Sequence, residues 1–477
     1  MDIEGNPFPD QAGSILQENF WLRSWTHETY LWNGEVVDRN PANYADPVAY
    51  FNTLKTTATT SSGRAKDQFH FSENTADYLA AVNSAPLATY GANYVAYSVS
   101  PPRDFRVAYT EPNSPASNIV GGQANLPRGT RILAVDGVDL VNGGSTQAQI
   151  DILNNGLFPA TAGETHTFVV QDAGASSSRS VTLTSVNLAE KPVNRTAIVH
   201  TPGGDVGYIL FTTFSPFSSE QEIAAAISAM KTASVSDLVL DLRYNGGGLL
   251  AVASQLGYMI AGGARTTGRT FERLQFNSAA GNLDPVTGEV NSPVPFYSTG
   301  LGFSLAQGAP LDSLNLPRVF VLTTGSTCSA SESVINSLRG VGVDVVQIGS
   351  TTCGKPYGFY PQDNCGETYF TIQFQGVNDI GFGDYADGFT PNNSSSNFGV
   401  RINGCAVADD LSHELGDQNE GLLATALQYR ASGSCPVATA AAAVAQTRTP
   451  SEGPLRTSRF TPLQQFLRGN RDMRMPH

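Results

Sequence analysis

The hydrophobic pattern from about residue 195 onward predicts strands that alternate with helices. Continuous apolar runs are typical of strands buried on both faces of a parallel sheet, and apolar residues at spacings of three and four are typical of helices. In chain order, the predicted elements are strand 206–211, helix 218–233, strand 238–242, helix 249–260, strand 319–324, helix 330–339 and strand 343–348. This order indicates an α/β fold over residues 191–436.

The rest of the chain divides into three parts with other patterns. Residues 1–92 show helical spacing and many aromatic residues, which predicts a helical region that buries its aromatic side chains. Residues 93–190 predict a small β-rich module. It has a strand at 94–99, a short helical segment that opens at 114–116, a turn, strand and turn over 126–137, a helix at 147–157 and a strand at 166–170. Residues 437–477 are Ala-rich and then polar, which predicts a flexible tail.

Composition and charge exclude several classes of function. The 477 residues include 28 basic and 42 acidic side chains, a net charge of −14, which argues against a nucleic-acid partner. No apolar run is long enough to span a membrane. The N-terminal residues lack the features of a secretory signal. We therefore expect either a cytoplasmic protein or one that a signal outside this sequence directs to the cell envelope, the periplasm or the medium.

The first segment with chemical potential is DLRYNGGG at residues 241–248. A predicted buried strand ends there in three glycines and leads into a helix. Backbone N–H groups at such a turn lack side-chain cover and can stabilise an oxyanion. Glycine-rich turns of this kind also bind phosphates or permit tight packing, so this segment alone leaves these alternatives open.

The second segment is GSTCSASE at residues 325–332, where a predicted buried strand leads into a serine at the start of a helix. This arrangement can expose a hydroxyl beside free N–H donors. The alternative is an ordinary serine cap with a glutamate in the first helical turn.

The third segment is GSTTCGKP at residues 349–356, which contains Lys355. A serine nucleophile needs a base, and none of the six histidines lies in the three segments. A lysine whose pKa is lowered by burial can serve as that base. The chain has only five lysines, and Lys355 alone lies in these segments. A solvated loop lysine is the alternative.

The order and spacing of these segments resemble the S41 family of serine peptidases, the C-terminal processing proteases. The resemblance covers roughly residues 93–435 and implies a crotonase/ClpP-like catalytic core with endopeptidase activity near the C-termini of proteins. It implies Ser329 as the nucleophile and Lys355 as the general base. The N–H groups of Ala330 and of Gly247 or Gly248 would be the oxyanion donors.

The residue that orients Lys355 is less well defined by this resemblance. Some members of the family carry a glutamine four residues after the lysine, where this chain has Phe359. Gln362 is our candidate for that role, and Ser326 is a second candidate for the nucleophile. A nucleophilic Cys328 is a further alternative. For the disulfides we predict Cys353 with Cys365 and Cys405 with Cys435, which leaves Cys328 unpaired.

The β-rich module resembles a PDZ domain through the sequence RGTRILAVDG at residues 128–137 and the order of its predicted elements. PDZ domains bind a partner's C-terminal peptide as an added strand. The resemblance implies a carboxylate-binding loop at Gly91, Ala92, Asn93 and Tyr94. A purely structural module is the alternative.

We therefore expect a serine endopeptidase with no cofactor and no metal, whose partners are protein or peptide substrates bound through their C-termini. The alternatives are a catalytically weak or inactive peptide-binding protein on the same scaffold and a crotonase-like acyl-CoA enzyme. Several acids towards the C-terminus raise the question of calcium, but solvated turns are the preferred interpretation because the chain has no EF-hand loop. These acids are Asp384, Asp387, Asp409, Asp410 and Asp417.

Overall fold

The computed structural model describes residues 12–82 and 86–436, together with residues 455, 458, 471–473 and 475. The predicted tail at 437–477 therefore lies mostly outside the described residues. Within the described part, no helix has the length and apolar character needed to cross a membrane.

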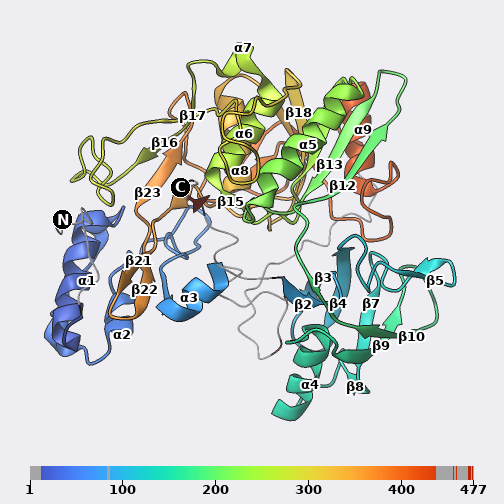
Figure 1. The fold of residues 1–477 in the computed structure, drawn as a ribbon, viewed down its shortest axis with the longest axis horizontal. Coiled ribbons are helices and arrows are strands. Elements are labelled where there is room, and N and C mark those ends of the chain that lie inside the picture. Colours follow the sequence, from blue (N-terminus) through green and yellow to red (C-terminus); the bar gives the residue numbers. More distant parts are fainter. Residues whose placement is uncertain are drawn as a thin grey trace.

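A six-stranded sheet forms the centre of the α/β region (Figure 1). Its strand order is β12-β13-β14-β18-β19-β26, and all neighbours are parallel except β12 and β13. The strands are β12 (Val193–Val199), β13 (Val206–Phe211), β14 (Asp237–Asp241), β18 (Arg318–Thr323), β19 (Asp344–Gly349) and β26 (Gly404–Ala406). The strands predicted in this region are confirmed, and each predicted bound lies within one residue of the observed bound.

Helices cover both faces of this sheet. The helices on one face are α5 (Ser218–Thr232), α6 (Leu250–Ala261) and α8 (Ala330–Gly340), and they bury Ile209 and Leu240 of the strands. On the other face α9 (Gly421–Ser432) packs with Leu210 and Val239. Side chains alternate between the two faces of a strand, so each residue packs in the apolar cluster on one face and the next residue packs in the cluster on the other face. This explains why the strand sequences are apolar throughout.

The β-rich module has the sheet order β10-β9-β7-β4-β3, with β3 at one edge. Its elements are β3 (Ala92–Ser98), β4 (Asp104–Thr110), β5 (Ile119–Val120), β6 (Gln123–Ala124), β7 (Arg131–Val135), β8 (Val138–Asp139), α4 (Gln147–Leu157), β9 (Thr165–Gln171) and β10 (Arg179–Thr184). The predicted helix 147–157 is confirmed. The predicted short helix at 114–116 is wrong: the chain makes turns there, because the carbonyl of Ser114 accepts from the amides of Ser117 and Asn118 and the chain reverses.

The N-terminal region contains helices, as predicted, but also a strand that joins it to the rest of the chain. Its elements are α1 (Ile15–Thr29), η1 (Asn33–Glu35), η2 (Pro41–Asn43), α2 (Pro47–Phe51), β1 (Phe71–Asn74), α3 (Thr75–Val82) and β2 (Leu87–Thr89). Strand β1 pairs with β22 (Glu367–Phe370). Trp25, Tyr50 and Phe51 are fully buried and pack with Tyr369. The aromatic residues therefore form a core, as expected.

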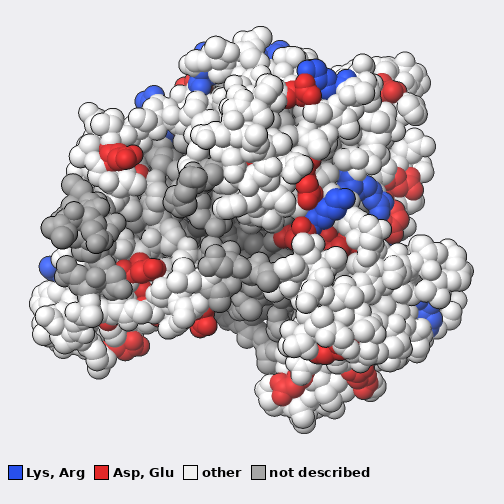
Figure 2. All heavy atoms as spheres, viewed as in Figure 1, with Lys and Arg blue, Asp and Glu red and all other residues white. Residues whose placement is uncertain are grey.

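The remaining elements surround the central sheet. They are β11 (Val186–Leu188), β15 (Gly248–Leu249), α7 (Gly263–Thr266), β16 (Thr270–Gln275), β17 (Val294–Pro295), β20 (Tyr357–Gly358), β21 (Gln362–Asn364), β23 (Phe374–Val377), β24 (Phe389–Pro391), β25 (Val400–Ile402) and β27 (Arg471–Asp472). On the face shown in Figure 2, the charged side chains lie in small groups, and the larger groups of Lys and Arg adjoin Asp and Glu side chains.

Candidate active site

Ser329 lies between the turn that follows β18 and the first residue of α8. Its backbone has φ +57° and ψ −114°, a conformation that costs a residue with a side chain about 1–3 kcal/mol and is retained where the surroundings enforce it. The residue is fully buried, and its hydroxyl oxygen has no hydrogen-bond partner among the described residues. Ser329 is the N-cap residue of α8 and its amide donates to Glu332, so the predicted cap with a glutamate in the first helical turn is present beside this hydroxyl.

The glycine turn after β14 lies directly against Ser329. A Cβ atom on Gly247 would lie 2.9 Å from the Cβ of Ser329 and 3.1 Å from the amide nitrogen of Ala330, so only glycine permits this approach. Asn245 fixes the turn: its carbonyl accepts from Cys328 N–H (3.1 Å) and from the Ser331 hydroxyl (3.1 Å). Its side-chain oxygen accepts from the amide of Gly247 at 2.9 Å. That contact engages one of the amides expected to bind an oxyanion.

Lys355 is only 2 % exposed, so the interpretation as a solvated loop lysine is wrong. The preceding Gly354 has φ +79°, and a Cβ there would lie 2.3 Å from the carbonyl oxygen of Ala386. This loop therefore requires glycine, and it directs Lys355 inward. The Nζ atom lies 4.7 Å from the ring centroid of Phe69 and 5.2 Å from that of Phe359. Two aromatic rings thus flank the amine of Lys355.

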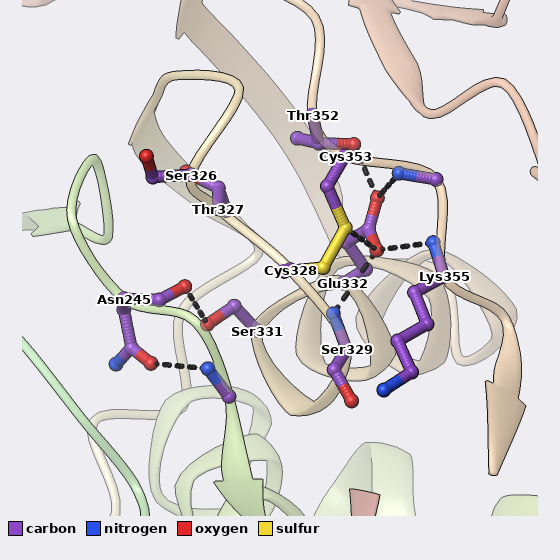
Figure 3. Close-up of a disulfide and its surroundings, with 12 residues drawn as sticks. Asn245, Ser326, Thr327, Cys328, Ser329, Ser331, Glu332, Thr352, Cys353 and Lys355 are labelled. Carbon is purple, nitrogen blue, oxygen red and sulfur yellow. Dashed lines mark hydrogen bonds between the residues drawn. A yellow bond between two sulfur atoms is a disulfide. The ribbon is translucent and has the colours of Figure 1, made fainter. Parts of the chain in front are cut away.

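Glu332 joins the segment of Ser329 to the segment of Lys355. Its Oε2 atom accepts from the amides of Ser329 (3.0 Å) and Lys355 (2.8 Å). Its Oε1 atom accepts from the hydroxyl of Thr352 (2.5 Å) and the amide of Gly354 (2.8 Å). Burial raises the pKa of Glu332, although these hydrogen bonds oppose the rise. Figure 3 shows the side chains of Ser329 and Lys355 extending in the same direction from this carboxylate.

A disulfide between Cys328 and Cys353 reinforces the same junction. Cys328 directly precedes Ser329, and Cys353 lies two residues before Lys355 (Figure 3). The predicted pair of Cys353 with Cys365 is therefore wrong, and a nucleophilic Cys328 is excluded because its sulfur is bonded. The predicted pair of Cys405 with Cys435 is confirmed. The packing of the two loops brings Cys328 and Cys353 together instead.

Replacing Cys328 and Cys353 together by serine is expected to lower the free energy of unfolding by about 3 kcal/mol, since the bond closes a 25-residue separation. It should also lower kcat, because the loops of Ser329 and Lys355 lose their covalent connection. The matched control replaces Cys405 and Cys435, which are 30 residues apart and join β26 to the residues just after α9. It should lower stability similarly and leave kcat unchanged below the unfolding transition. Equal kcat values in both double variants would contradict this role.

A buried ion network connects the glycine turn to the β-rich module. Arg243, inside the DLRYNGGG motif, binds Asp241, Asp409 and Glu420 and is fully buried. Arg128 of the β-rich module binds the same Asp409 at 2.6 Å. Burial by itself would raise the pKa of Asp409, but the two arginines lower it below its ordinary value. Asp409 is thus an ion-pair partner rather than a residue of a solvated turn.

Gln362 and Ser326 were the remaining candidates from the sequence. Gln362 belongs to β21, in the separate sheet β1-β22-β21, and its amide donates to the carbonyl of Asp363. Phe359 occupies the position at which some family members carry a glutamine, and its ring centroid lies 5.2 Å from the Nζ atom of Lys355. Ser326 is half-buried in the turn before Ser329.

The four residues of the predicted carboxylate loop lie at the start of the edge strand β3. Gly91 has φ +81°, Ala92 begins β3, Asn93 donates to Glu111 at 3.4 Å and Tyr94 packs edge-on against Phe158.

Asn245 and the full role of Glu332 were not predicted. Both lie inside the recognised motifs, and an asparagine before a run of glycines is a sequence signal for a fixed turn.

Comparison with known proteins identifies the same region. The model of peptidase family S41 matches residues 205–359, and the model of the peptidase S41 N-terminal domain matches residues 17–72. No curated protein matches the chain. A Bacteroides fragilis protein described as an S41 protease is 24% identical, with a TM-score of 0.63 over 89% of this chain and 99% of its own. This similarity shows a common fold.

Two further solved structures are more distant. The photosystem II D1 C-terminal processing protease is 18% identical over 82% of this chain and 94% of its own, with a TM-score of 0.45. Mature CPAF is 12% identical over 79% of this chain and 92% of its own, with a TM-score of 0.38. The matched peptidase region contains the glycine turn, Ser329 and Lys355, and the matched N-terminal domain precedes it. Over residues 17–72 and 205–359, this chain therefore matches the models of peptidase family S41.

Proposed function

We propose that this protein is a serine endopeptidase in which Ser329 is the nucleophile and Lys355 is the general base. The observation that carries the proposal is the shared contact at Glu332: one carboxylate oxygen accepts the amides of both residues, at 3.0 and 2.8 Å. Two loops from distant parts of the sequence are thereby fixed with a hydroxyl and an amine on one side of the carboxylate. The disulfide between Cys328 and Cys353 limits their separation further.

In the proposed reaction, the neutral amine of Lys355 takes the proton of Ser329 as its oxygen attacks a peptide carbonyl carbon. Burial beside Phe69 and Phe359 keeps bulk water away from the amine. The negative charge on the carbonyl oxygen is stabilised by backbone N–H groups. We assign this role to Ala330, at the N-terminus of α8, and to Gly248, since the Gly247 amide is engaged by Asn245.

The second half of the reaction releases the acyl group. The ammonium of Lys355 returns its proton to the leaving amine, so that the peptide bond breaks and an ester of Ser329 remains. Lys355 then takes a proton from water as the water oxygen attacks the ester carbonyl carbon. It returns this proton to the Ser329 oxygen as the ester bond breaks, so that the acyl group leaves as a carboxylic acid and the serine is restored. Every step uses groups of the chain and water, and we propose no cofactor or metal.

We further propose that the β-rich module acts as a PDZ-like domain that binds the C-terminal segment of a substrate. Its strand β3 lies at the edge of the sheet, and an edge strand can accept an extended peptide. The turn at Gly91 precedes this strand, where a carboxylate would meet backbone N–H groups. The ion pair of Arg128 with Asp409 joins the module to the catalytic region. The two disulfides favour an oxidising compartment such as the periplasm or the medium.

The test of this function is digestion of an unfolded protein such as casein, with products identified by mass spectrometry. We expect internal cleavage, and the same preparation of Ser329→Ala gives the background. A labelled peptide offered with a free or an amidated C-terminus tests capture, and the free acid should be cleaved faster. A folded protein that binds these peptides but cleaves neither them nor casein would refute the endopeptidase proposal and favour a peptide-binding protein.

A further inference from the structure

Residues 471 and 472, in the segment that follows α9, lie beside the glycine turn after β14. Strand β27 (Arg471–Asp472) pairs in parallel with β15 (Gly248–Leu249), with Gly248 opposite Arg471 and Leu249 opposite Asp472. Figure 1 shows this short red strand beside β15, near the mark for the C-terminal end. Gly248 is the glycine to which we assign oxyanion binding, so the paired backbone lies at the position where a scissile carbonyl is required.

The position of β27 between two strands supports its placement where a substrate peptide would lie. One edge of β15 is already used, because Leu249 N–H donates to the carbonyl of Phe214. Strand β27 takes the other edge and also lies against β20 (Tyr357–Gly358), which begins two residues after Lys355. The segment is thus held between the strand of the oxyanion turn and the strand that follows the base. Extended peptides bind to an exposed strand edge through main-chain hydrogen bonds, largely independently of sequence.

Two apolar side chains of the same segment are anchored on the two parts to which we assign peptide binding. Met473 is half-buried and packs against the main apolar cluster of the catalytic region. Leu455 is 2 % exposed and belongs to the apolar cluster of the β-rich module, together with Tyr90 and Ala92 at the start of β3. The segment therefore contacts both the module and the catalytic turn, as the proposed substrate would.

We infer that residues 471–473 occupy the strand position of a substrate beside the catalytic turn, so that this chain's own segment competes with substrate for the site. The inference rests on the proposed function, because it identifies the β15 edge as the substrate position. A segment bound for most of the time reduces the competent fraction of the enzyme and raises the apparent KM in proportion. Removal of the segment should therefore increase kcat/KM mainly through KM.

The test compares the full chain with a chain that ends at Arg468 and with the full-length variant Met473→Asp. We expect both changes to raise kcat/KM on a labelled peptide about 10-fold, as for a site free one-tenth of the time. The matched control is Met475→Asp, because Met475 is 44% exposed two residues further along and its replacement should have no effect. A synthetic peptide of residues 468–477 should inhibit the shortened chain competitively.

Binding of the labelled peptide 468–477 to the shortened chain carrying Ser329→Ala separates this inference from the proposed function, since binding needs no catalysis. Saturable binding, with no peptide hydrolysis by any variant that keeps Ser329, would refute the proposed endopeptidase function and retain the binding site for the segment. Hydrolysis with equal KM in the full and shortened chains, and no peptide binding, would overturn the inference and retain the function. Removal of the segment by the wild-type protein but not by Ser329→Ala would also overturn it, since the segment would then be a substrate.

Discussion

Replacing Ser329 by alanine is expected to lower kcat for peptide hydrolysis by at least about 1,000-fold, because no other group at this position can form the acyl intermediate. The hydroxyl has no hydrogen-bond partner among the described residues, so its removal leaves no buried polar group unsatisfied. Alanine retains the Cβ atom and therefore the same backbone strain at φ +57°. The free energy of unfolding should thus stay close to that of the wild type.

The matched control is Ser326→Ala, three residues earlier in the same turn. Ser326 is half-buried and, like Ser329, was a candidate nucleophile, but its amide donates to Thr324. Its replacement should leave kcat within about twofold of wild type, as is usual for a surface change away from special features. Hydrolysis is measured with a labelled peptide and unfolding with urea. A wild-type kcat in Ser329→Ala would contradict Ser329 as the nucleophile. If kcat were lost in Ser326→Ala but not in Ser329→Ala, Ser326 would be the nucleophile instead.

The pattern of apolar residues was sufficient to predict the central sheet and its helices. Strand β13 and helix α4 have the predicted bounds, because each is defined by the pattern of apolar residues within its own segment. The site motifs could be predicted for a similar reason. Each lies at the end of a buried strand, and the carboxyl ends of parallel strands β14, β18 and β19 meet at one edge of the sheet.

Contacts between distant loops could not be predicted in this way. The disulfide of Cys328 with Cys353 depends on how two loops pack, and sequence spacing does not report this. Phe69 belongs to the N-terminal region, yet its ring faces Lys355. The N-terminal region thus completes the surroundings of the base, although its pattern indicated only a structural role.

Replacing Lys355 by methionine is expected to lower kcat by about 1,000-fold while leaving the protein at least as stable as the wild type. Methionine fills the space between Phe69 and Phe359 with an apolar side chain, and sulfur packs favourably against aromatic rings. It cannot accept the proton of Ser329, so the contribution of a general base is lost. The backbone amide of residue 355 still donates to Glu332, and the junction with the Ser329 loop is retained.

Lys66→Met is the matched control, because the Nζ atom of Lys66 also lies 4.7 Å from an aromatic ring centroid, that of Trp32. Lys66 binds Glu35 at 2.6 Å and is outside the catalytic loops, so its replacement should leave kcat within about twofold.

A second variant, Lys355→Ala, leaves space for an added amine. Small primary alkylamines should restore part of its kcat, whereas they should have no effect on Lys355→Met. A Lys355→Met protein that keeps more than a tenth of wild-type kcat would show that another group removes the serine proton. Absence of amine rescue in Lys355→Ala, with kcat still lost, would instead indicate that the lysine positions Ser329 rather than accepting its proton.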